Sequence, residues 1–300
     1  MAIRPRRALV MINRRAARGK RSILQGLRIL DRAGIEPDLH VVKKPDKISE
    51  LIRRHADTCD RVVIGGGDGT LSGATDALLA TQTPLGILPM GNANDLVRTL
   101  GLPADIDEAF RVIGHGRLKQ IDVGSVGKRH FFNVASIGLS VTIAKRLTCD
   151  IKQRWGVLGY LGCAWEAVRS SPRFHVRIVC DGRPLETAAI QVSIGNGRHY
   201  GGGMTIVDDA SIDDGRLDVY VLPPMPRWRL LSIVPALRRG THRPLPDVFS
   251  LHGTEIEVHT DRSMPINVDG EVAASTPAVF RVLREALSVF VPPAMPAVSG

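Results

Sequence analysis

The chain of 300 residues has few aromatic side chains, only 4%, and its basic residues are scattered in short groups. Nucleic-acid platforms combine a continuous basic surface with rings on which bases stack, so we expect no nucleic-acid partner. The four cysteines lie far apart, with no CxxC pair and no histidine at ligand spacing. This pattern predicts reduced cysteines, with neither a zinc site nor a disulfide framework.

Long apolar runs are also absent. No stretch approaches the ~20 apolar residues of a membrane-spanning helix, and the apolar run at residues 8–12 is too short for the core of a signal peptide. We therefore expect a cytoplasmic protein that associates with membranes only peripherally.

What the chain does have is positive charge and enough apolar residues for two cores. Its net charge is +10 and 44% of its residues are hydrophobic. The length allows one large domain or two ordinary ones, and favours two. The charge favours an anionic partner: nucleic acid, a phosphorylated metabolite or an anionic membrane surface. Charge alone does not choose among these.

Residues 1–122 alternate between apolar strands and amphipathic helices. This alternation predicts an α/β nucleotide-binding domain with a parallel sheet covered on both faces. The expected strands are 8–12, 39–42, 61–64 and 84–88, and the expected helices are 22–34 (capped by Ser22), 48–55, 71–80, 95–100 and 106–113.

Residues 123–300 carry short alternating strands, which predict an antiparallel β-sandwich. We leave open that the C-terminal tail of roughly 15 residues returns to the first domain. The expected elements are hairpins of 121–126 with 130–134 and of 175–179 with 189–194, strands 217–221, 255–258 and 265–268, and helices 155–168 and 227–239.

A glycine-rich stretch, IGGGDGTLSG at residues 64–73, follows the third expected strand. Glycines between a strand and a helix let backbone N–H groups approach phosphate oxygens with no Cβ in the way. The alternative is a tight βα turn without a ligand. The stretch is neither a P-loop nor a dinucleotide fingerprint. The candidate phosphate-binding residues are Gly65, Gly66, Gly67, Asp68, Gly69 and Thr70.

A second polar loop, PMGNAND at residues 89–95, follows the next strand, with Asn94 or Asp95 expected to cap the helix after it. Loops after neighbouring parallel strands emerge at the same sheet edge, where ligands bind. Two such loops therefore make a phosphate site more probable than one.

GGGDGT followed by PxGxxND resembles the diacylglycerol kinase catalytic-domain superfamily, which includes bacterial lipid kinases related to sphingosine and ceramide kinases. Residues 132–138 resemble the FxNxxxxG strand of this family, and 196–204 its NGxxxGGGM segment. Residues 211–218 resemble its DDGxLD turn, and 268–271 its DGE motif. The matches run in family order from about residue 8 to residue 292. GGDGT alone is shared with NAD kinases and phosphofructokinases, whereas the combination is specific.

The resemblance implies transfer of a phosphoryl group from ATP, with Mg²⁺, to the hydroxyl of a membrane lipid. It implies that Glu271 is the general base with Asp269 beside it. The chemistry of the residue itself suggests that Asp68 acts through Mg²⁺, because this ion prefers carboxylate oxygens. The glycine loop would hold the ATP phosphates, bordered by Asn13, Gly91, Asn92, Asn94 and Asp95. A further Mg²⁺ that supports the second domain would lie at Ser211, Asp214 and the backbone of Arg216.

The residue chemistry agrees with these roles, because phosphoryl transfer needs charge neutralisation, positioning and a proton acceptor. Taken alone, Asp269-Gly270 would be an ordinary hairpin turn and Asp214-Gly215 a plain turn. Three positions depart from the family pattern. Arg14 stands where a proline is usual, no threonine lies near 41–43, and Asn92 replaces a common threonine.

The lipid acceptor stays open at this stage: it could be diacylglycerol-like, ceramide-like or sphingoid-like. The apolar segment 155–165 is either core or an acyl-chain wall, and the cationic, Trp-bearing segment 227–239 is either a membrane-surface helix or a docked surface helix. The alternatives to a lipid kinase are a kinase of a soluble acceptor such as NAD, and a non-catalytic regulator that binds nucleotides or nucleic acid.

Overall fold

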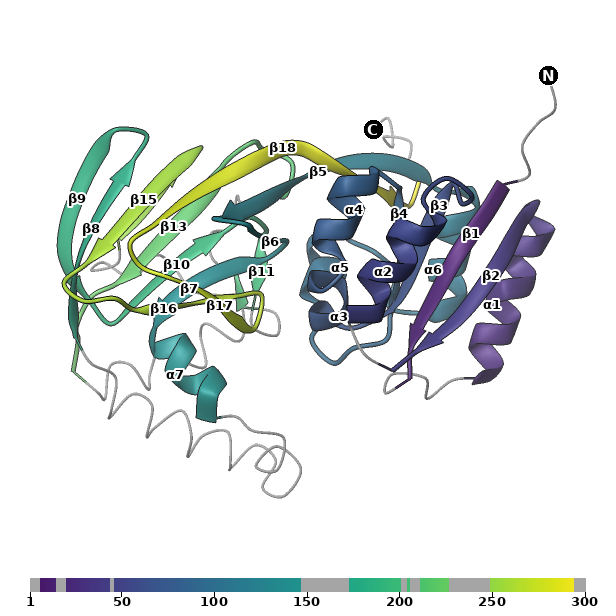
Figure 1. Cartoon of the computed structure of the whole chain (residues 1–300), viewed down its shortest axis with the longest axis horizontal. Helices are drawn as coiled ribbons and strands as arrows, with labels where there is room; N and C mark the ends of the chain where they lie inside the picture. The colour runs from purple at the N-terminus through teal and green to yellow at the C-terminus, as the bar shows by residue number, and fades with distance from the viewer. Residues whose placement is uncertain are drawn as a thin grey trace, which may run out of the picture. The chain divides into compact units, whose positions relative to one another are not determined.

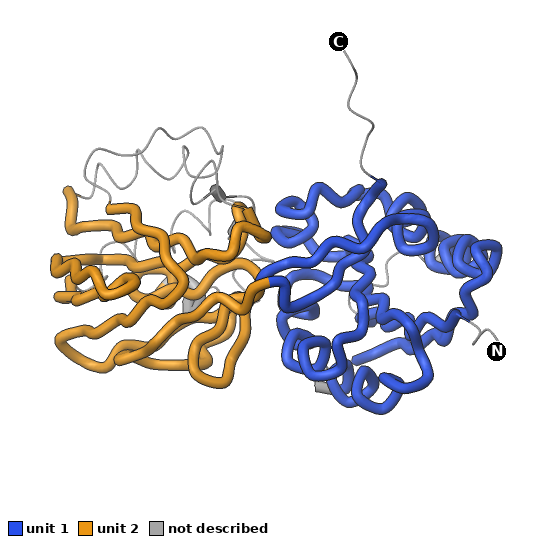
Figure 2. Tube along the Cα trace, turned by 90° about the horizontal axis from the view of Figure 1, so that it is seen from above, with its two compact units in different colours: residues 1–122, 285–300 blue, residues 123–284 orange. Residues whose placement is uncertain are grey.

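The computed structural model describes residues 6–14, 20–43, 46–146, 173–200, 204–205, 211–226 and 249–293. The chain forms two compact units, which Figure 2 colours blue and orange. Unit 1 comprises residues 1–122 and 285–300, and unit 2 comprises residues 123–284. In the described part of the chain, no helix is long and apolar enough to cross a bilayer.

Unit 1 is built on a parallel sheet in the order β2-β1-β3-β4, to which the end of β18 (Ala278–Val291) adds beside β4 (Figure 1). Its inner strands are buried apolar runs, as the sequence predicts for a parallel sheet covered by helices. The strands are β1 (Arg6–Asn13), β2 (Ile35–Val42), β3 (Arg61–Gly66) and β4 (Leu85–Pro89).

Helices cover both faces of this sheet. They are α1 (Lys20–Arg32), α2 (Asp46–His55), α3 (Asp68–Ser72), α4 (Thr75–Thr81), α5 (Asp95–Thr99) and α6 (Ile106–His115). Helices α1 and α6 contact each other, and α2 contacts α4 and β1. Phe110 of α6 is fully buried in the core shared with α1 and β1. A Cβ on Gly26 of α1 would lie 1.9 Å from the Phe110 ring, so only glycine lets these two helices pack so closely.

Two helix predictions in unit 1 need correction. The helix expected at 71–80 is two helices, α3 and α4, that meet at Gly73 and Ala74. Glycine is a poor helix former, and Gly73 ends α3. Helix α1 begins at Lys20, so Ser22 lies inside its first turn and does not cap it. Lys and Arg are good helix formers, which extends the helix towards the N-terminus.

Unit 2 contains two antiparallel sheets (Figure 1). Apolar residues of both sheets form one core. This is the β-sandwich that the alternating pattern predicts. One sheet has the order β14-β13-β10-β7-β16-β17, and the other runs from β18 through β15 and β8 to β9. The strands and the helix α7 are β6 (Arg129–Phe131), β7 (Val134–Gly138), α7 (Leu139–Arg146), β8 (Phe174–Cys180), β9 (Arg183–Ala189), β10 (Gln191–Gly195), β13 (Leu217–Leu222), β14 (Phe249–Gly253), β15 (Glu255–Thr260), β16 (Pro265–Val268) and β17 (Glu271–Ser275), with a short pair of β11 (His199–Tyr200) and β12 (Met204–Thr205).

One hairpin prediction is wrong in its second strand. Asp181 and Gly182 do form a two-residue turn with positive φ, but the turn joins β8 to β9. The segment expected as the partner, 189–194, is mostly β10, which pairs with β13 and β7 in the other sheet. The sequence of β9, RPLETAA, has too few apolar residues to signal a strand, because β9 is a partly exposed edge.

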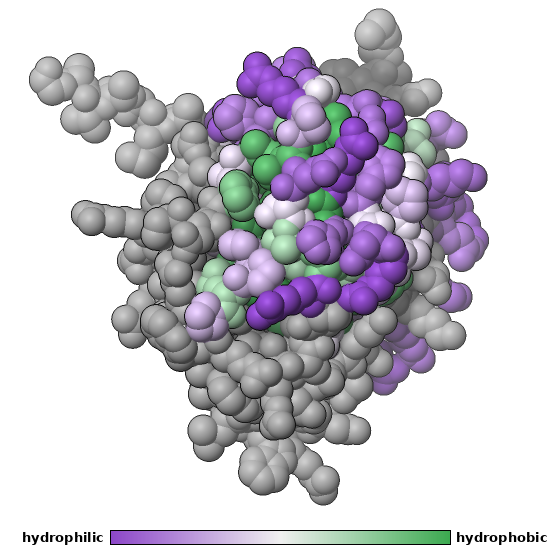
Figure 3. Space-filling model, turned by 90° about the vertical axis from the view of Figure 1, so that its left-hand side faces the viewer, coloured by the Kyte–Doolittle hydropathy of each residue, from purple (hydrophilic) through white to green (hydrophobic). Residues whose placement is uncertain are grey.

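Charged side chains mark this edge. Arg177 of β8 pairs with Glu186 of β9, both well exposed. Figure 3 looks onto this side of the molecule and shows hydrophilic residues over much of the described surface, with a smaller apolar area between them. Charged residues on an edge strand oppose pairing with another sheet. The helices expected at 155–168 and 227–239 lie outside the described residues.

The chain passes between the units in two strands, β5 (Arg117–Val126) and β18 (Ala278–Val291). At the point where β18 enters unit 1, Glu285 has a φ of 47°, and its backbone N–H donates to Asp122 Oδ1 over 2.7 Å. The side chain of Asp122 is buried. One buried carboxylate thus holds the strained residue at which the chain returns to unit 1.

Candidate functional site

The glycine loop and the second loop of unit 1 lie against each other at the carboxyl ends of β3 and β4. Met90 N donates to Gly66 O over 3.1 Å, and a Cβ on Gly91 would lie 2.4 Å from Gly67 Cα. A Cβ on Gly65 would meet Ile12 Cδ1 at 2.6 Å. Gly91 is therefore required by packing within the chain, whatever else binds there, whereas a side chain at Gly65 would have to displace the flexible ends of Ile12 and Met90.

Gly69 is different from its neighbours. It is an exposed residue of α3, and a Cβ there would have nothing within 4 Å. A helical glycine costs about 1 kcal/mol relative to alanine. No contact within the described chain explains this cost, so the bare backbone at Gly69 is open to a ligand.

Two carboxylates lie close together beside this backbone. Asp68 accepts a hydrogen bond of 3.3 Å from the N–H of Leu96, and Asp95 next to Leu96 is 5% exposed. Burial raises the pKa of the Asp68 carboxyl above its ordinary value, and the charge of Asp95 raises it further, while backbone hydrogen bonds lower it in part. Two like charges away from water favour a bound cation, and carboxylate oxygens suit Mg²⁺.

Asn94 closes the second loop. Its Oδ1 accepts from Gly91 N and its Nδ2 donates to Gly91 O, both over 3.0 Å, with Asn94 itself at a φ of 51°. Asn94 is the N-cap residue of α5, one of the two positions expected to cap this helix. Its side chain makes no capping bond, however, and Asp68 from the other loop binds the N–H of Leu96 instead. Asn92 is exposed at the tip.

Asn13 joins the first strand to the glycine loop. Its Nδ2 donates to Thr70 Oγ1 over 3.0 Å, and Thr70 is 6% exposed. The Thr70 hydroxyl can in turn donate to one further acceptor. Among the predicted nucleotide residues, Asn13 and Thr70 meet directly at one end of the sheet, and Asp68 meets the second loop there.

In unit 2, Asp269 and Gly270 form the two-residue turn between β16 and β17, with φ values of 46° and 102°. Glu271 is exposed at the first position of β17. The Asp269 carboxylate accepts three backbone N–H groups of the neighbouring segment, from Phe132, Asn133 and Val134, over 2.8, 3.1 and 3.0 Å. Asp269 thus fixes the hairpin on which Glu271 stands.

The NGxxxGGGM segment meets the same place. Asn196 is buried, its N donates to Asn133 O over 2.9 Å, and its Nδ2 donates to Phe132 O over 3.1 Å. Asn133 is also buried, and its Oδ1 has no hydrogen-bond partner among the described residues. Three motifs far apart in the sequence therefore converge around β7. Asn133 and Asn196 received no role from the sequence, although both stand inside quoted motifs.

Ser211, Asp214 and Arg216 share a turn before β13. Asp214 accepts from Ser211 N over 3.3 Å and from Arg216 N over 3.2 Å, and it pairs with Arg216 Nε at 3.1 Å. In this arrangement the Asp214 carboxylate is already balanced by a guanidinium, and a Mg²⁺ ion would have to displace it. The cation site at this turn stays a prediction, and no step below depends on it.

Comparison with known proteins matches both units. The family described as the diacylglycerol kinase catalytic domain matches residues 7–126. The family described as the YegS C-terminal NAD kinase beta sandwich-like domain matches residues 133–291.

Whole proteins match along their length. A diacylglycerol kinase of Staphylococcus saprophyticus is 29% identical over 276 residues, which cover 91% of this chain and 90% of that protein. One of Staphylococcus carnosus is 28% identical with the same coverage. The crystal structure of a diacylglycerol kinase from Bacillus anthracis superposes with a TM-score of 0.80 at 25% identity, covering 98% of this chain and 99% of that chain.

Proposed function

The chain belongs to the diacylglycerol kinase family of bacterial proteins that carry a YegS-type C-terminal domain, and on this basis we propose that it is an ATP-dependent lipid kinase. It would transfer the γ-phosphoryl group of ATP to the hydroxyl of a membrane lipid. The observation that carries the proposal is the open backbone at Gly69, beside the Asp68 and Asp95 carboxylates.

The proposed nucleotide site is made from the two loops of unit 1. Backbone N–H groups at the glycine loop would donate to phosphate oxygens, and the Thr70 hydroxyl, oriented by Asn13, would donate to another. Mg²⁺ that arrives with ATP would neutralise phosphate charge in the transition state, and Asp68 and Asp95 are the residues that would hold it. Asn92 and Asn94 would border the nucleotide, with Asn94 fixing the shape of its loop.

The proposed acceptor site belongs to unit 2. Glu271 would accept the proton of the lipid hydroxyl as that oxygen bonds to the γ-phosphorus and ADP leaves. Asp269, whose carboxylate is taken up by three backbone N–H groups, would position Glu271 and would not itself exchange protons. This division of roles follows from the surroundings of the two carboxylates. Glu271 is exposed to solvent, whereas the Asp269 carboxylate is held by three backbone hydrogen bonds.

An acceptor in a membrane explains the basic composition. The net charge of +10 would attract the protein to anionic lipids, at roughly 1 kcal/mol per basic residue near the surface. We propose a cytoplasmic enzyme that associates peripherally with the membrane that holds its substrate. The segment 227–239 is a candidate for this contact and lies outside the described residues.

The experiment that tests the proposal is a kinase assay over a panel of lipids. Diacylglycerol, ceramide and a sphingoid base are offered in neutral and in anionic vesicles, with ATP and Mg²⁺, and the products are identified by mass. We expect one lipid class to be phosphorylated, and faster in anionic vesicles, with a rate that falls as the salt concentration rises.

NAD serves as the soluble comparison acceptor in the same assay. Phosphorylation of NAD in preference to every lipid would replace the proposal with a kinase of a soluble acceptor. Salt-sensitive binding of nucleic acid without turnover of ATP on any acceptor would replace it with a regulator.

The replacement Gly69→Ala tests whether the glycine serves a ligand. Because a Cβ there meets nothing within 4 Å, alanine should fold normally and raise the free energy of unfolding by about 0.5–1 kcal/mol. The same methyl group should obstruct a phosphate on the backbone and raise the KM for ATP about tenfold or more. Thermal unfolding and steady-state kinetics measure the two effects.

The matched control is Gly114→Ala in α6, where a Cβ would make only an ordinary contact of 3.4 Å with Ala33. That variant should keep the KM of the wild type. An unchanged KM in Gly69→Ala would show that no phosphate rests on this backbone.

A further inference from the structure

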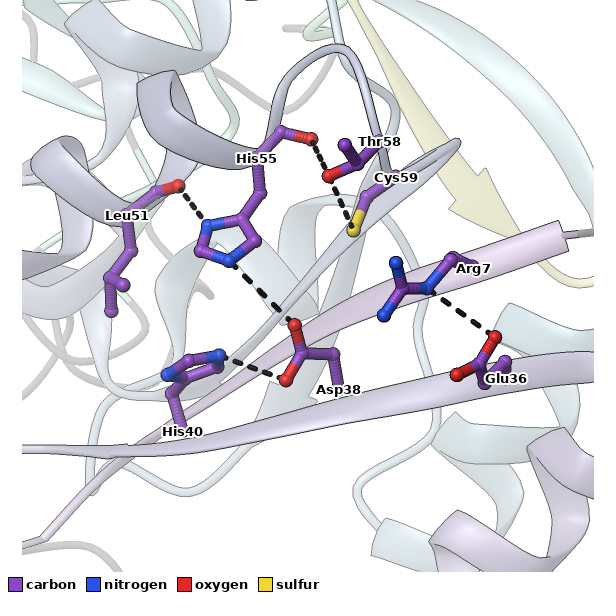
Figure 4. A network of polar contacts seen from close by, with 8 residues as sticks. All are labelled: Arg7, Glu36, Asp38, His40, Leu51, His55, Thr58 and Cys59. Atoms are coloured by element: carbon purple, nitrogen blue, oxygen red, sulfur yellow. Dashed lines mark hydrogen bonds and ion pairs between the residues drawn. The ribbon is translucent and has the colours of Figure 1, made fainter.

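A second group of metal-ligating side chains lies in unit 1, away from the two loops. Asp38 and His40 of β2 and His55 of α2 each offer a ligand atom, and these atoms all lie within 4.8 Å of one another (Figure 4). All three residues are half-buried. Nothing in the proposed phosphoryl transfer uses them.

The fold creates this group from distant parts of the sequence. Asp38 and His40 are two residues apart on one strand, so both side chains lie on the same face of the sheet. Helix α2 ends at His55 over that face, and the rings of His40 and His55 are 5.4 Å apart between centroids. The carboxyl end of a helix carries partial negative charge, which favours a cation.

His40 and Asp38 meet without a hydrogen bond. His40 Nε2 lies 2.9 Å from Asp38 Oδ1, but the two atoms are not in hydrogen-bond geometry. Nε2 is buried and has no other hydrogen-bond partner among the described residues. A buried nitrogen so close to a carboxylate oxygen calls for a proton or a metal ion that both can share.

The hydrogen bond of His55 Nδ1 also points to a cation between His55 Nε2 and Asp38. Its Nδ1 lies 3.0 Å from the carbonyl oxygen of Leu51, and a carbonyl can only accept, so Nδ1 carries the hydrogen. In the neutral ring, Nε2 then presents a lone pair to Asp38 Oδ2, 3.7 Å away. Two acceptors face each other unless a cation lies between them. A backbone carbonyl that fixes the tautomer in this way is a common partner of metal-binding histidines.

We propose that Asp38, His40 and His55 bind a divalent first-row metal ion, and that Zn²⁺ fits best. Tetrahedral Zn²⁺ with bonds of about 2.0–2.2 Å places neighbouring donor atoms about 3.3 Å apart. The two N···O distances here, 2.9 and 3.7 Å, lie on either side of that value. Two imidazoles and one carboxylate suit Zn²⁺, whereas Mg²⁺ requires oxygen ligands. Three protein ligands leave the fourth position to water.

The neighbouring charges permit a cation. Arg7 is the nearby basic side chain in Figure 4, and it pairs with Glu36 at 3.4 Å. Cys59 is also close by, but burial raises the pKa of its thiol and it is not one of the three ligands. The proposed metal site thus lies beside the Arg7–Glu36 ion pair, whose two charges neutralise each other.

The site is separate from the proposed nucleotide site. Asp38 pairs with Leu9 of β1, whereas Asn13 pairs with Val42 at the carboxyl end of the sheet. Replacing the three ligands should therefore leave ATP-dependent turnover close to that of the wild type.

Titration of the full chain with Zn²⁺ tests the proposal, by isothermal calorimetry against a competing chelator and by the absorption of bound Co²⁺. We expect one equivalent of Zn²⁺ to bind. Asp38→Asn and His55→Gln should each weaken binding at least tenfold. Millimolar Mg²⁺ should not compete.

The control is His259→Gln, because His259 Nε2 lies 3.5 Å from Glu257 Oε2 in a pair that has no third ligand among the residues that the structure describes. It should bind Zn²⁺ as the wild type does. Circular dichroism shows whether Asp38→Asn or His55→Gln fails to fold. In that case, the Zn²⁺ affinity of the other, folded variant tests the proposal. Wild-type protein that binds no Zn²⁺ holds only a proton-bridged ion cluster, and this result would overturn the proposal. Equal affinity in Asp38→Asn, His55→Gln and His259→Gln would do the same.

Discussion

Asp68→Asn should lower kcat/KM for ATP-dependent phosphorylation by about 10³-fold while making the protein more stable. Activity falls because an amide removes one of the two negative charges that would hold Mg²⁺ against the phosphates. Stability rises because the pKa of Asp68 is raised in the folded state, mainly by burial and next by Asp95, so its ionised form opposes folding. The asparagine can still accept the hydrogen bond from Leu96 N.

The pH dependence gives this prediction a second readout. A carboxyl whose pKa is raised on folding binds protons more tightly in the native state, so its cost to stability grows as pH rises from the ordinary value of 3.8 through the folded value. The difference in unfolding free energy between variant and wild type should be largest at neutral pH and narrow towards pH 3.8. Urea unfolding across this range measures it.

The control for Asp68 is Asp57→Asn, an exposed carboxylate in the same unit. It should keep the activity of the wild type and change the free energy of unfolding by no more than about 0.5 kcal/mol. An Asp68→Asn protein that keeps full activity would remove Asp68 from the proposed mechanism. A less stable variant would contradict the cause that we assign to its raised pKa.

Glu271→Gln should lower kcat by about 10²–10⁴-fold, the usual contribution of a general base. Glu271 is exposed, so the substitution should leave stability and the KM for ATP nearly unchanged. Steady-state kinetics with varied lipid and ATP, together with thermal unfolding, measure these effects.

Glu257→Gln provides the comparison, since Glu257 is another partly exposed glutamate at a β-strand of unit 2. It should keep wild-type kinetics. Unlike Glu271→Gln, Asp269→Ala should lower the free energy of unfolding by about 1–3 kcal/mol, because three backbone N–H groups would lose their acceptor. A Glu271→Gln enzyme with the kcat of the wild type would show that another group accepts the proton.

The regular elements of unit 1 were largely predictable from sequence. Each inner strand is a continuous apolar run, because it is buried on both faces, and polar loops that contain glycine follow β3 and β4. The exceptions have two causes. Gly73, a poor helix former, divides α3 from α4, whereas the binding of Leu96 N by Asp68 depends on a contact between two loops that sequence does not encode locally.

In unit 2 the strands were less predictable, for a related reason. Edge strands such as β9 are polar on exposed faces, so they lack the apolar alternation that signals a strand. Which strand pairs with which is a matter of long-range contacts, and the segment after Asp181-Gly182 was therefore given the wrong partner.

The sequence by itself determined the family, the two architectures and the set of motif residues, because glycine spacing and strand periodicity are local patterns that can be recognised without a structure. Only the tertiary structure distinguished glycines that packing requires, such as Gly91, from Gly69, which it leaves open. Only the tertiary structure separated the restrained Asp269 from the exposed Glu271 next to it. It also joined His55 to Asp38 and His40, where linear spacing had given no sign of a metal site, because a strand and the helix that packs on it are brought together only by folding.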